Sequence, residues 1–269
     1  MASTHTLETP DGTLYYEVRG EGPVLVLAGA PMGAEEFVPV ADVLARDRTV
    51  LTHDPRGISR STLNDPEQDS TPELRADDVV ALLDALGADS ADVLGSSGGA
   101  VTALALARRH PGRVRTAVAH EPPLMELLPD AAEQRAAMED LIATYHREGV
   151  AAAWAKFMAN AGFPVEEGDG APAEEPSEQM LADSARFFAH ELRETARYVP
   201  DTDALRGGPV RVVVGVGADS GPLSTSRSSV ALADLLGTAP VTFPGGHGGF
   251  TDDPEGFAAV LRGVLESRR

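Results

Sequence analysis

Residues 91–109 constrain the fold of this chain more than any other stretch. An apolar run ends in a Gly-Ser-Ser-Gly-Gly turn at 95–99 and passes directly into a helical pattern. This is a strand, a sharp turn and a helix, with the G-x-S-x-G spacing centred on Ser97. A serine on so tight a turn needs very small neighbours, and Gly95 and Gly99 supply them. The stretch predicts a βα unit that presents the Ser97 hydroxyl, or alternatively a glycine-rich loop that binds nothing or cradles a phosphate.

The same alternation of strand and helix continues along most of the chain. An early strand is expected at 13–19, and buried apolar runs that predict strands occupy 23–28, 49–53, 114–120, 210–216 and 241–243. Helical patterns lie between them at 35–45, 74–86 and 229–236, and a final helix is expected from 254 to 268. The fold class is therefore α/β, with a mostly parallel central sheet flanked by helices.

One block interrupts this alternation. Residues 124–200 contain no convincing strand, and helices are expected at 131–147, 149–160 and 178–197. An acidic run rich in Pro and Gly, 163–176, predicts a mobile loop between them. Residues 1–123 and 201–269 then form one large domain, with 124–200 inserted as a helical unit.

The inserted block is rich in methionine and aromatic side chains. These side chains either pack the block onto the main domain or form the apolar pocket wall of a lid. They are Met125, Met138, Tyr145, Trp154, Phe157, Met158, Met180, Phe187, Phe188 and Tyr198.

Composition excludes several classes of function. The chain has 42 acidic and only 22 basic residues, a formal net charge of −20, which disfavours binding to nucleic acid or to an anionic membrane. Cysteine is absent, which excludes disulfides, thiolate metal sites and a cysteine nucleophile. No H-E-x-x-H or other paired-histidine spacing predicts a metal site. Residues 1–10 do not resemble a signal peptide and no apolar stretch is long enough for a membrane span, so a cytoplasmic location is expected.

Three polar residues follow the ends of predicted strands: Ser97, Asp219 and His247. The carboxyl ends of parallel strands share one edge of a sheet, so residues distant in the sequence converge there. A serine hydroxyl is a weak nucleophile unless a base takes its proton, as His247 would do. Asp219 would orient the imidazole and stabilise its protonated form. Asp219 could also be a simple turn residue before Ser220-Gly221-Pro222.

With these residues in the order serine, acid, histidine, the chain resembles the α/β-hydrolase-fold superfamily over nearly its whole length. The resemblance implies that 124–200 is a helical cap after the sixth strand. It places oxyanion-hole donors at the backbone N–H groups of Ala30 and Gly98, although Ala28 stands where the family often has histidine. Some members carry the acid after the preceding strand, which makes Glu121 the alternative acid.

The resemblance also covers two lesser features. Asp54 and Arg56 are similar to the family's Asp-x-Arg-Gly turn, where we expect a structural ion pair. His120, His146 and His190 are expected to be cap or loop residues without a catalytic role.

The expected function is a serine hydrolase that cleaves a carboxylic ester or lactone through an acyl-enzyme intermediate, without cofactor or metal. A cofactor-free haloperoxidase (perhydrolase), a thioesterase or a C–C bond hydrolase would use the same three residues. Haloalkane dehalogenases and epoxide hydrolases of this fold carry aspartate at the turn, so Ser97 argues against both. A ligand-binding sensor built on a hydrolase scaffold is the alternative from another class. The expected partner is a small, apolar, ester-like molecule, and the oligomeric state is left open.

Overall fold

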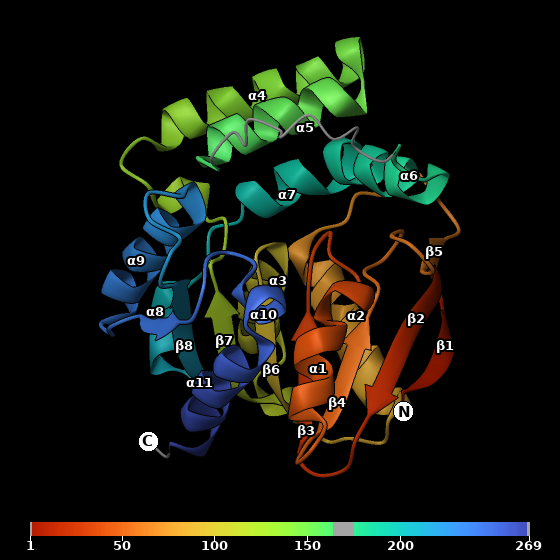
Figure 1. Ribbon diagram of the computed structural model, residues 1–269, viewed down its shortest axis with the longest axis vertical. Coiled ribbons are helices and arrows are strands. Elements are labelled where there is room, and N and C mark those ends of the chain that lie inside the picture. The colour runs from red at the N-terminus through yellow and green to blue at the C-terminus, as the bar shows by residue number, and fades with distance from the viewer. Residues whose placement is uncertain (1, 164–174, 268–269) are drawn as a thin grey trace.

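The computed structural model describes residues 2–163 and 175–267 and contains one nine-stranded sheet (Figure 1). The strand order is β1-β2-β4-β3-β6-β7-β8-β9, with the short β5 paired to β2. The strands are β1 (Ser3–Thr9), β2 (Gly12–Arg19), β3 (Val24–Ala28), β4 (Thr49–His53), β5 (Thr62–Leu63), β6 (Ala91–Ser96), β7 (Val114–His120), β8 (Arg211–Gly217) and β9 (Val241–Phe243). Along the sheet from β4 through β3, β6, β7 and β8 to β9, each strand is parallel to the next. The antiparallel pairs all include β2, which pairs with β1, β4 and β5. The prediction of a mostly parallel sheet flanked by helices is confirmed.

The predicted strands all occur, each within one residue of its expected limits. The sequence pattern missed β1 and β5. Strand β1 is an edge strand whose side chains are mostly exposed, so it carries no apolar run that could have marked it. Its backbone is held by seven residue pairs with β2, which is a contact that local sequence does not encode.

Helices cover both faces of the sheet, and a further group lies beyond the ends of its strands (Figure 1). The helices are α1 (Val38–Leu44), α2 (Pro72–Ala85), α3 (Gly98–Arg109), α4 (Ala131–Glu148), α5 (Val150–Ala161), α6 (Glu178–Arg186), α7 (Leu192–Ala196), α8 (Thr202–Gly207), α9 (Ser224–Leu236), α10 (Gly249–Asp252) and α11 (Pro254–Glu266). Short 3-10 turns are η1 (Glu35–Phe37), η2 (Pro111–Arg113) and η3 (Met125–Leu127), and a π turn, η4 (Phe187–Glu191), joins α6 to α7.

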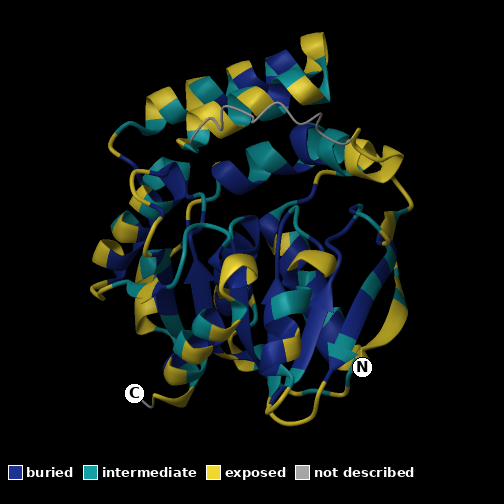
Figure 2. Cartoon of the chain, viewed as in Figure 1, coloured by how far each residue is buried: buried dark blue, intermediate teal, exposed yellow. Residues whose placement is uncertain are grey.

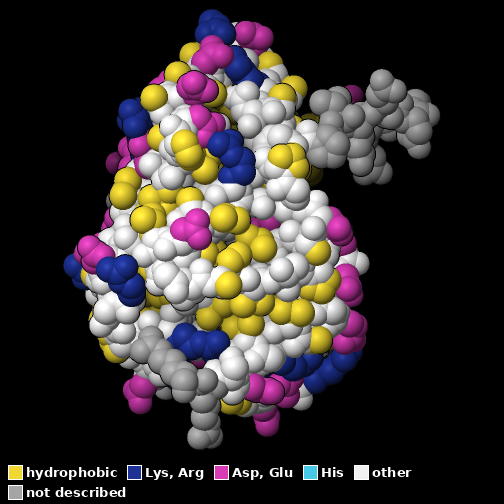
Figure 3. All heavy atoms as spheres, turned by 90° about the vertical axis from the view of Figure 1, so that its left-hand side faces the viewer, with side chains coloured by type: hydrophobic (Ala, Val, Ile, Leu, Met, Phe, Trp, Pro, Cys, Tyr) yellow, Lys and Arg dark blue, Asp and Glu magenta, His cyan; other side chains and the backbone are white. Residues whose placement is uncertain are grey.

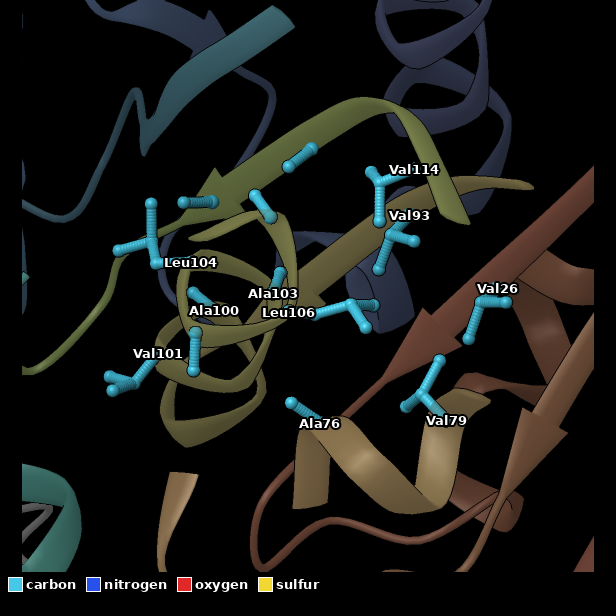
Figure 4. Packing of buried hydrophobic residues seen from close by; sticks show 14 of the residues in the cluster. Val26, Ala76, Val79, Val93, Ala100, Val101, Ala103, Leu104, Leu106 and Val114 are labelled. Atoms are coloured by element: carbon cyan, nitrogen blue, oxygen red, sulfur yellow. The ribbon is translucent and has the colours of Figure 1, made fainter. Parts of the chain in front are cut away.

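The hydrophobic core lies on both faces of the sheet, whose central strands are largely buried (Figure 2). On one face, α2 and α3 pack over β3 and β6 (Figure 4). Small side chains such as Ala100 and Ala103 let α3 approach the sheet closely, next to Val93 of β6. On the other face, α1 and α11 pack through residues such as Phe37 and Phe257. This two-sided core fixes the strand ends where the site residues sit.

Helices α4 to α7 (residues 131–161 and 178–196, with η4) form a group that we call the helical layer (Figure 1). They match the predicted helical ranges, and between Leu124 and Pro200 no described residue is in a strand. The layer has its own apolar cluster, in which Trp154 stacks on Phe187 with ring centroids 5.6 Å apart. Most of the predicted mobile loop, residues 164–174, lies outside the described residues.

The expected ion pair between Asp54 and Arg56 is wrong. Asp54 instead binds Arg60, with nitrogen–oxygen distances of 2.7 and 2.9 Å. Arg56 forms a bidentate ion pair with Asp78 of α2, in which both hydrogen bonds are 2.7 Å long. The two residues are near neighbours in sequence, but each has a better-placed partner from elsewhere in the fold.

Charged side chains are spread over the surface seen in Figure 3, and the helices contain no candidate membrane span in the described residues. On the face shown in Figure 3, acidic and basic side chains are interspersed around hydrophobic ones. Within the described part of the chain, every helix is too short or too polar to cross a bilayer.

Candidate active site

Ser97 sits at the apex of the turn between β6 and α3. Its backbone has φ 56° and ψ −126°, a conformation that residues other than glycine rarely adopt. A Cβ added to Gly95 would overlap the carbonyl of Gly99, and one added to Gly99 would overlap the carbonyl of Ala28. The prediction that only very small residues fit two positions before and two positions after Ser97 is confirmed, because backbone atoms occupy the space that a side chain at Gly95 or Gly99 would need.

His247 lies in the loop between β9 and α10, half-buried, and its ring is held by a carboxylate. Its Nδ1 is 2.5 Å from Oε2 of Glu121, the residue that directly follows β7. Glu121 itself is fully buried and has φ 51°. Because Glu121 occupies Nδ1, the other ring nitrogen, Nε2, is the one available for chemistry.

The expected contact between Asp219 and His247 is wrong, and Glu121 takes that place. Asp219 is exposed in the turn after β8; its backbone N–H donates to the carbonyl of Gly245 at 2.9 Å. Its carboxylate forms no hydrogen bond with any described residue. The acid beside His247 is therefore the alternative that the sequence offered after the preceding strand.

The end of β8 shows why Glu121 can reach the histidine. Strand β8 lies between β7 and β9, so a carboxylate from β7 must cross it. The residue at the crossing is Gly217, whose N–H donates to Oε1 of Glu121 at 2.9 Å. A Cβ at Gly217 would lie 2.7 Å from the carbonyl oxygen of Gly246, too close for a real side chain. Gly217 therefore supplies an amide donor to the carboxylate, and its lack of a side chain lets the backbone of Gly246 pack against the end of β8.

The surroundings of Glu121 favour its charged form. Burial acts to raise the pKa of Glu121, but the hydrogen bonds from His247 and from the Gly217 amide outweigh it and hold the pKa at about 2. The Thr225 hydroxyl donates a further bond to Oε2 at 3.2 Å. Glu121 is thus a carboxylate at any ordinary pH and can stabilise a positive charge on the His247 ring.

His120 is neither a cap nor a loop residue, contrary to expectation, but the last residue of β7 and fully buried. Its Nδ1 bonds the hydroxyl of Ser96 at 3.0 Å, and its carbonyl accepts the N–H of Ser97 at 3.0 Å. Burial lowers the pKa of His120 to about 4, so the ring is neutral. His120 therefore ties the serine turn to the strand that carries Glu121.

The loop after β3 lies against the serine turn. A Cβ on Gly98 would meet the carbonyl of Ala30, which shows how closely the two backbones approach. Neither the N–H of Ala30 nor that of Gly98 donates a hydrogen bond to a described residue. Both residues line the same cavity as Ser97 and His247, so two amide donors are available beside the serine.

That cavity has a volume of about 280 Å³ and lies between the serine turn and the helical layer. Its wall is largely apolar on the side of the layer, formed by Met138, Leu141, Trp154, Phe157, Met158 and Phe187. Some members of the methionine and aromatic set line the cavity, as the pocket-wall interpretation expects, and others do not. Phe188 is buried inside the layer and Met180 is 60% exposed, and neither lines the cavity.

The residues that the structure describes include no cluster of three or more histidine or acidic side chains placed to hold a metal ion. The polar groups at the serine turn are instead a hydroxyl, an imidazole, a buried carboxylate and free amides. Such a set suits proton transfer and nucleophilic attack.

The chain matches known proteins over nearly its whole length. Residues 22–164 match the family described as alpha/beta hydrolase fold. The chain is 34% identical to "Uncharacterized hydrolase YraK" of Bacillus subtilis (strain 168), over 98% of this chain and 96% of that protein. It is 31% identical to a zearalenone hydrolase of Bionectria ochroleuca, over 97% of both. The solved structure of a thermophilic esterase from Thermogutta terrifontis superposes with a TM-score of 0.73 at 24% identity, covering 98% of each chain. On the family match and the relatives above 30% identity, the chain belongs to the α/β-hydrolase family.

Proposed function

We propose that this protein is a serine hydrolase that cleaves a carboxylic ester or lactone with an apolar body. One observation carries the proposal: Ser97, at its strained apex, and His247, held by the buried carboxylate of Glu121, line the same apolar cavity. A nucleophile, a base and an orienting acid in one cavity is the arrangement that acyl transfer needs.

In the first half of the reaction, Nε2 of His247 takes the proton of the Ser97 hydroxyl as its oxygen attacks the substrate carbonyl carbon. The tetrahedral intermediate collapses when His247 gives that proton to the leaving alkoxide, which frees an alcohol and leaves an acyl group on Ser97. With a lactone, the alcohol stays attached to the acyl group because the ring has opened. Glu121 fixes the tautomer with a proton on Nδ1 and stabilises the imidazolium throughout.

In the second half, His247 takes a proton from water, the hydroxide attacks the acyl carbon, and the carboxylic acid leaves as Ser97 regains its proton. The N–H groups of Ala30 and Gly98 would bind the oxyanion in both halves. Each donor of this kind contributes about 2.7–4 kcal/mol of transition-state stabilisation. Because both donors are backbone groups, the alanine at position 28 leaves them in place.

The chemistry of the cavity and the relatives support an apolar substrate. A wall of methionine and aromatic side chains favours hydrocarbon or ring groups over charged ones. Relatives at 34% and 31% identity are named as hydrolases, one of them for zearalenone. We propose that the helical layer acts as the cap that closes this cavity over the substrate.

The nucleophile is tested with a fluorophosphonate, which labels activated serines covalently. Wild-type protein should gain the mass of one phosphonyl group, and Ser97→Ala should gain none. Ser96→Ala, at the neighbouring serine, is the matched control and should still be labelled at Ser97. An unlabelled wild type would overturn the proposal and favour a ligand-binding role on a hydrolase scaffold.

The substrate class is tested with a panel of esters, lactones (zearalenone among the compounds), thioesters and peracid-forming conditions. A diketone cleaved at a C–C bond completes the panel. We expect ester or lactone cleavage with the highest kcat/KM. Faster turnover of a thioester, of peracid formation or of the C–C bond substrate would move the activity to that class while leaving the three residues in their roles.

A further inference from the structure

Thr195 is a buried hydroxyl residue in the cavity wall. It lies on α7, the short helix of the helical layer that faces the strand ends (Figure 1). Its exposed fraction is 4%, and it is one of the residues that line the cavity shared by Ser97 and His247. A hydroxyl buried so deeply is expected to use its hydrogen-bonding groups.

The oxygen of Thr195 is already engaged as an acceptor. Arg75 of α2, only 2% exposed, donates from Nη2 to Thr195 Oγ1 at 3.0 Å. The same guanidinium also donates to the hydroxyl of Thr102 at 2.9 Å and to the carbonyl of Ser70 at 2.7 Å. Arginine has no acceptor, so the Thr195 hydrogen cannot return the bond. These contacts fix the position of Thr195 and leave its hydrogen to point elsewhere.

The usual internal acceptors do not take that hydrogen. Helical threonine and serine hydroxyls commonly donate to the carbonyl four residues earlier, as Thr144 does to Asp140 at 2.8 Å. No such bond forms at Thr195, which lies in α7, the helix that follows the π turn η4. The carboxylate of Glu191, buried in that turn, accepts no hydrogen bond from any described residue. Thr195 therefore holds an unused donor.

We propose that the Thr195 hydroxyl donates into the cavity and selects substrates that carry a second oxygen acceptor. The class is an ester or lactone whose apolar acyl or alcohol part bears one ether, keto or hydroxyl oxygen away from the reacting carbonyl. This inference rests on the proposed serine-hydrolase function, and it names the feature that the substrate of that site carries.

The apolar wall makes this proposal sharply testable. An oxygen placed against the apolar part of the wall loses its bonds to water and gains nothing, so it weakens binding there. A fixed donor reverses this at one position only. A series of p-nitrophenyl octanoates in which an ether oxygen replaces each methylene from C4 to C7 in turn, away from the reacting carbonyl, locates that position.

In wild-type protein, one oxa-ester should exceed the others in kcat/KM by about 3- to 10-fold, the usual value of one net hydrogen bond. Thr195→Val, of similar shape, should lose this preference, and Thr195→Ser should keep it. Thr144→Val makes the same change on α4, away from the cavity, and should keep the preference. Ser224→Ala removes another buried hydroxyl of the wall and should keep it as well.

Two results would overturn the proposal: a wild-type series without a favoured position, or a preference that survives in Thr195→Val or disappears in Ser224→Ala. The first needs no variant, so the test holds even if Thr195→Val does not fold. Failure of the underlying function looks different, because then no ester is cleaved and the fluorophosphonate does not label Ser97.

Discussion

Backbone strain marks the residues of the candidate site. Among the described residues, only Ser59, Ser97 and Glu121 have positive φ without being glycine. Two of these three belong to the proposed catalytic set, and they follow neighbouring strands of the sheet. Such conformations persist only where surrounding contacts impose them, and here His120 binds the N–H of Ser97 while Gly217 binds Glu121.

The assignment of the acid is tested by two substitutions. Glu121→Gln keeps the shape of the side chain but turns the imidazole toward the wrong tautomer, so kcat should fall by about 10²- to 10⁴-fold. Asp219→Asn changes an exposed carboxylate with no described partner, and kcat should stay within about twofold of wild type, as for most surface changes. Steady-state kinetics on a p-nitrophenyl ester measures both.

The reverse result, a crippled Asp219→Asn beside an active Glu121→Gln, would return the acid to the end of β8. Fluorophosphonate labelling gives a second reading. Glu121→Gln should be labelled more slowly than wild type, because the base that activates Ser97 is impaired.

At the scale of elements, the turn between β6 and α3 depends on the contact with β3. Gly99, in the first turn of α3, lies against the carbonyl of Ala28 at the end of β3. The glycine therefore sets how closely the helix approaches the sheet, and with it the position of the Ser97 hydroxyl. The same approach brings Gly98 against Ala30, so one packing contact positions both Ser97 and the two amides that we propose as oxyanion donors.

Gly99→Ala should therefore damage both stability and activity. The added methyl group overlaps backbone that cannot move aside, and such overpacking costs about 1–3 kcal/mol. Gly263→Ala is the matched control, because Gly263 is helical in α11 and has nothing within 4 Å of an added Cβ. It should raise the free energy of unfolding by up to about 1 kcal/mol. Urea denaturation and ester kinetics on both variants check this, and a Gly99→Ala protein as stable and active as wild type would contradict it.

At the scale of the whole molecule, buried titratable groups make the fold sensitive to acid. Burial lowers the pKa of both His53 and His120 to about 4, against an ordinary value of about 6.5. Between those values the unfolded chain binds protons that the folded protein does not. The stability that these neutral rings contribute is complete above pH 6.5 and is lost as the pH falls toward 4. Glu121, with its pKa lowered to about 2, continues the same trend at lower pH.

The free energy of unfolding should thus fall between pH 6.5 and 4.5, with each buried histidine adding up to about 1.4 kcal/mol per pH unit to the slope. His53→Leu should reduce that slope, because leucine binds no proton, and the excess of protons that the unfolded chain binds over the folded protein is then smaller. His146→Leu, at an exposed position of α4, should leave it unchanged. Urea denaturation at several pH values measures the slopes, and an unchanged slope in His53→Leu would refute the role of that ring.

Local sequence determined most of the architecture. Apolar runs broken by glycine and proline marked the parallel strands, and 3.6-residue periodicity marked the helices, because both signals reflect burial of nearby side chains. The Gly-x-Ser-x-Gly spacing located the serine, because the crowding that demands glycine comes from adjacent elements of one βα unit. Strand β1 was not predicted, because its side chains are mostly exposed and so it has no apolar run, although its backbone pairs with β2.

Only the tertiary structure decided which acid meets His247. Glu121 and Asp219 each follow a buried strand, so the sequence offered both. The choice depends on the sheet: β8 lies between β7 and β9, and its last residue, Gly217, donates its N–H to the carboxylate of Glu121 that reaches His247. The sequence also could not predict which side chains line the cavity, because this depends on which face each helix of the helical layer turns toward the sheet. Sequence thus determined the elements and the position of Ser97 at the turn, whereas packing across three strand ends determined which carboxylate contacts His247.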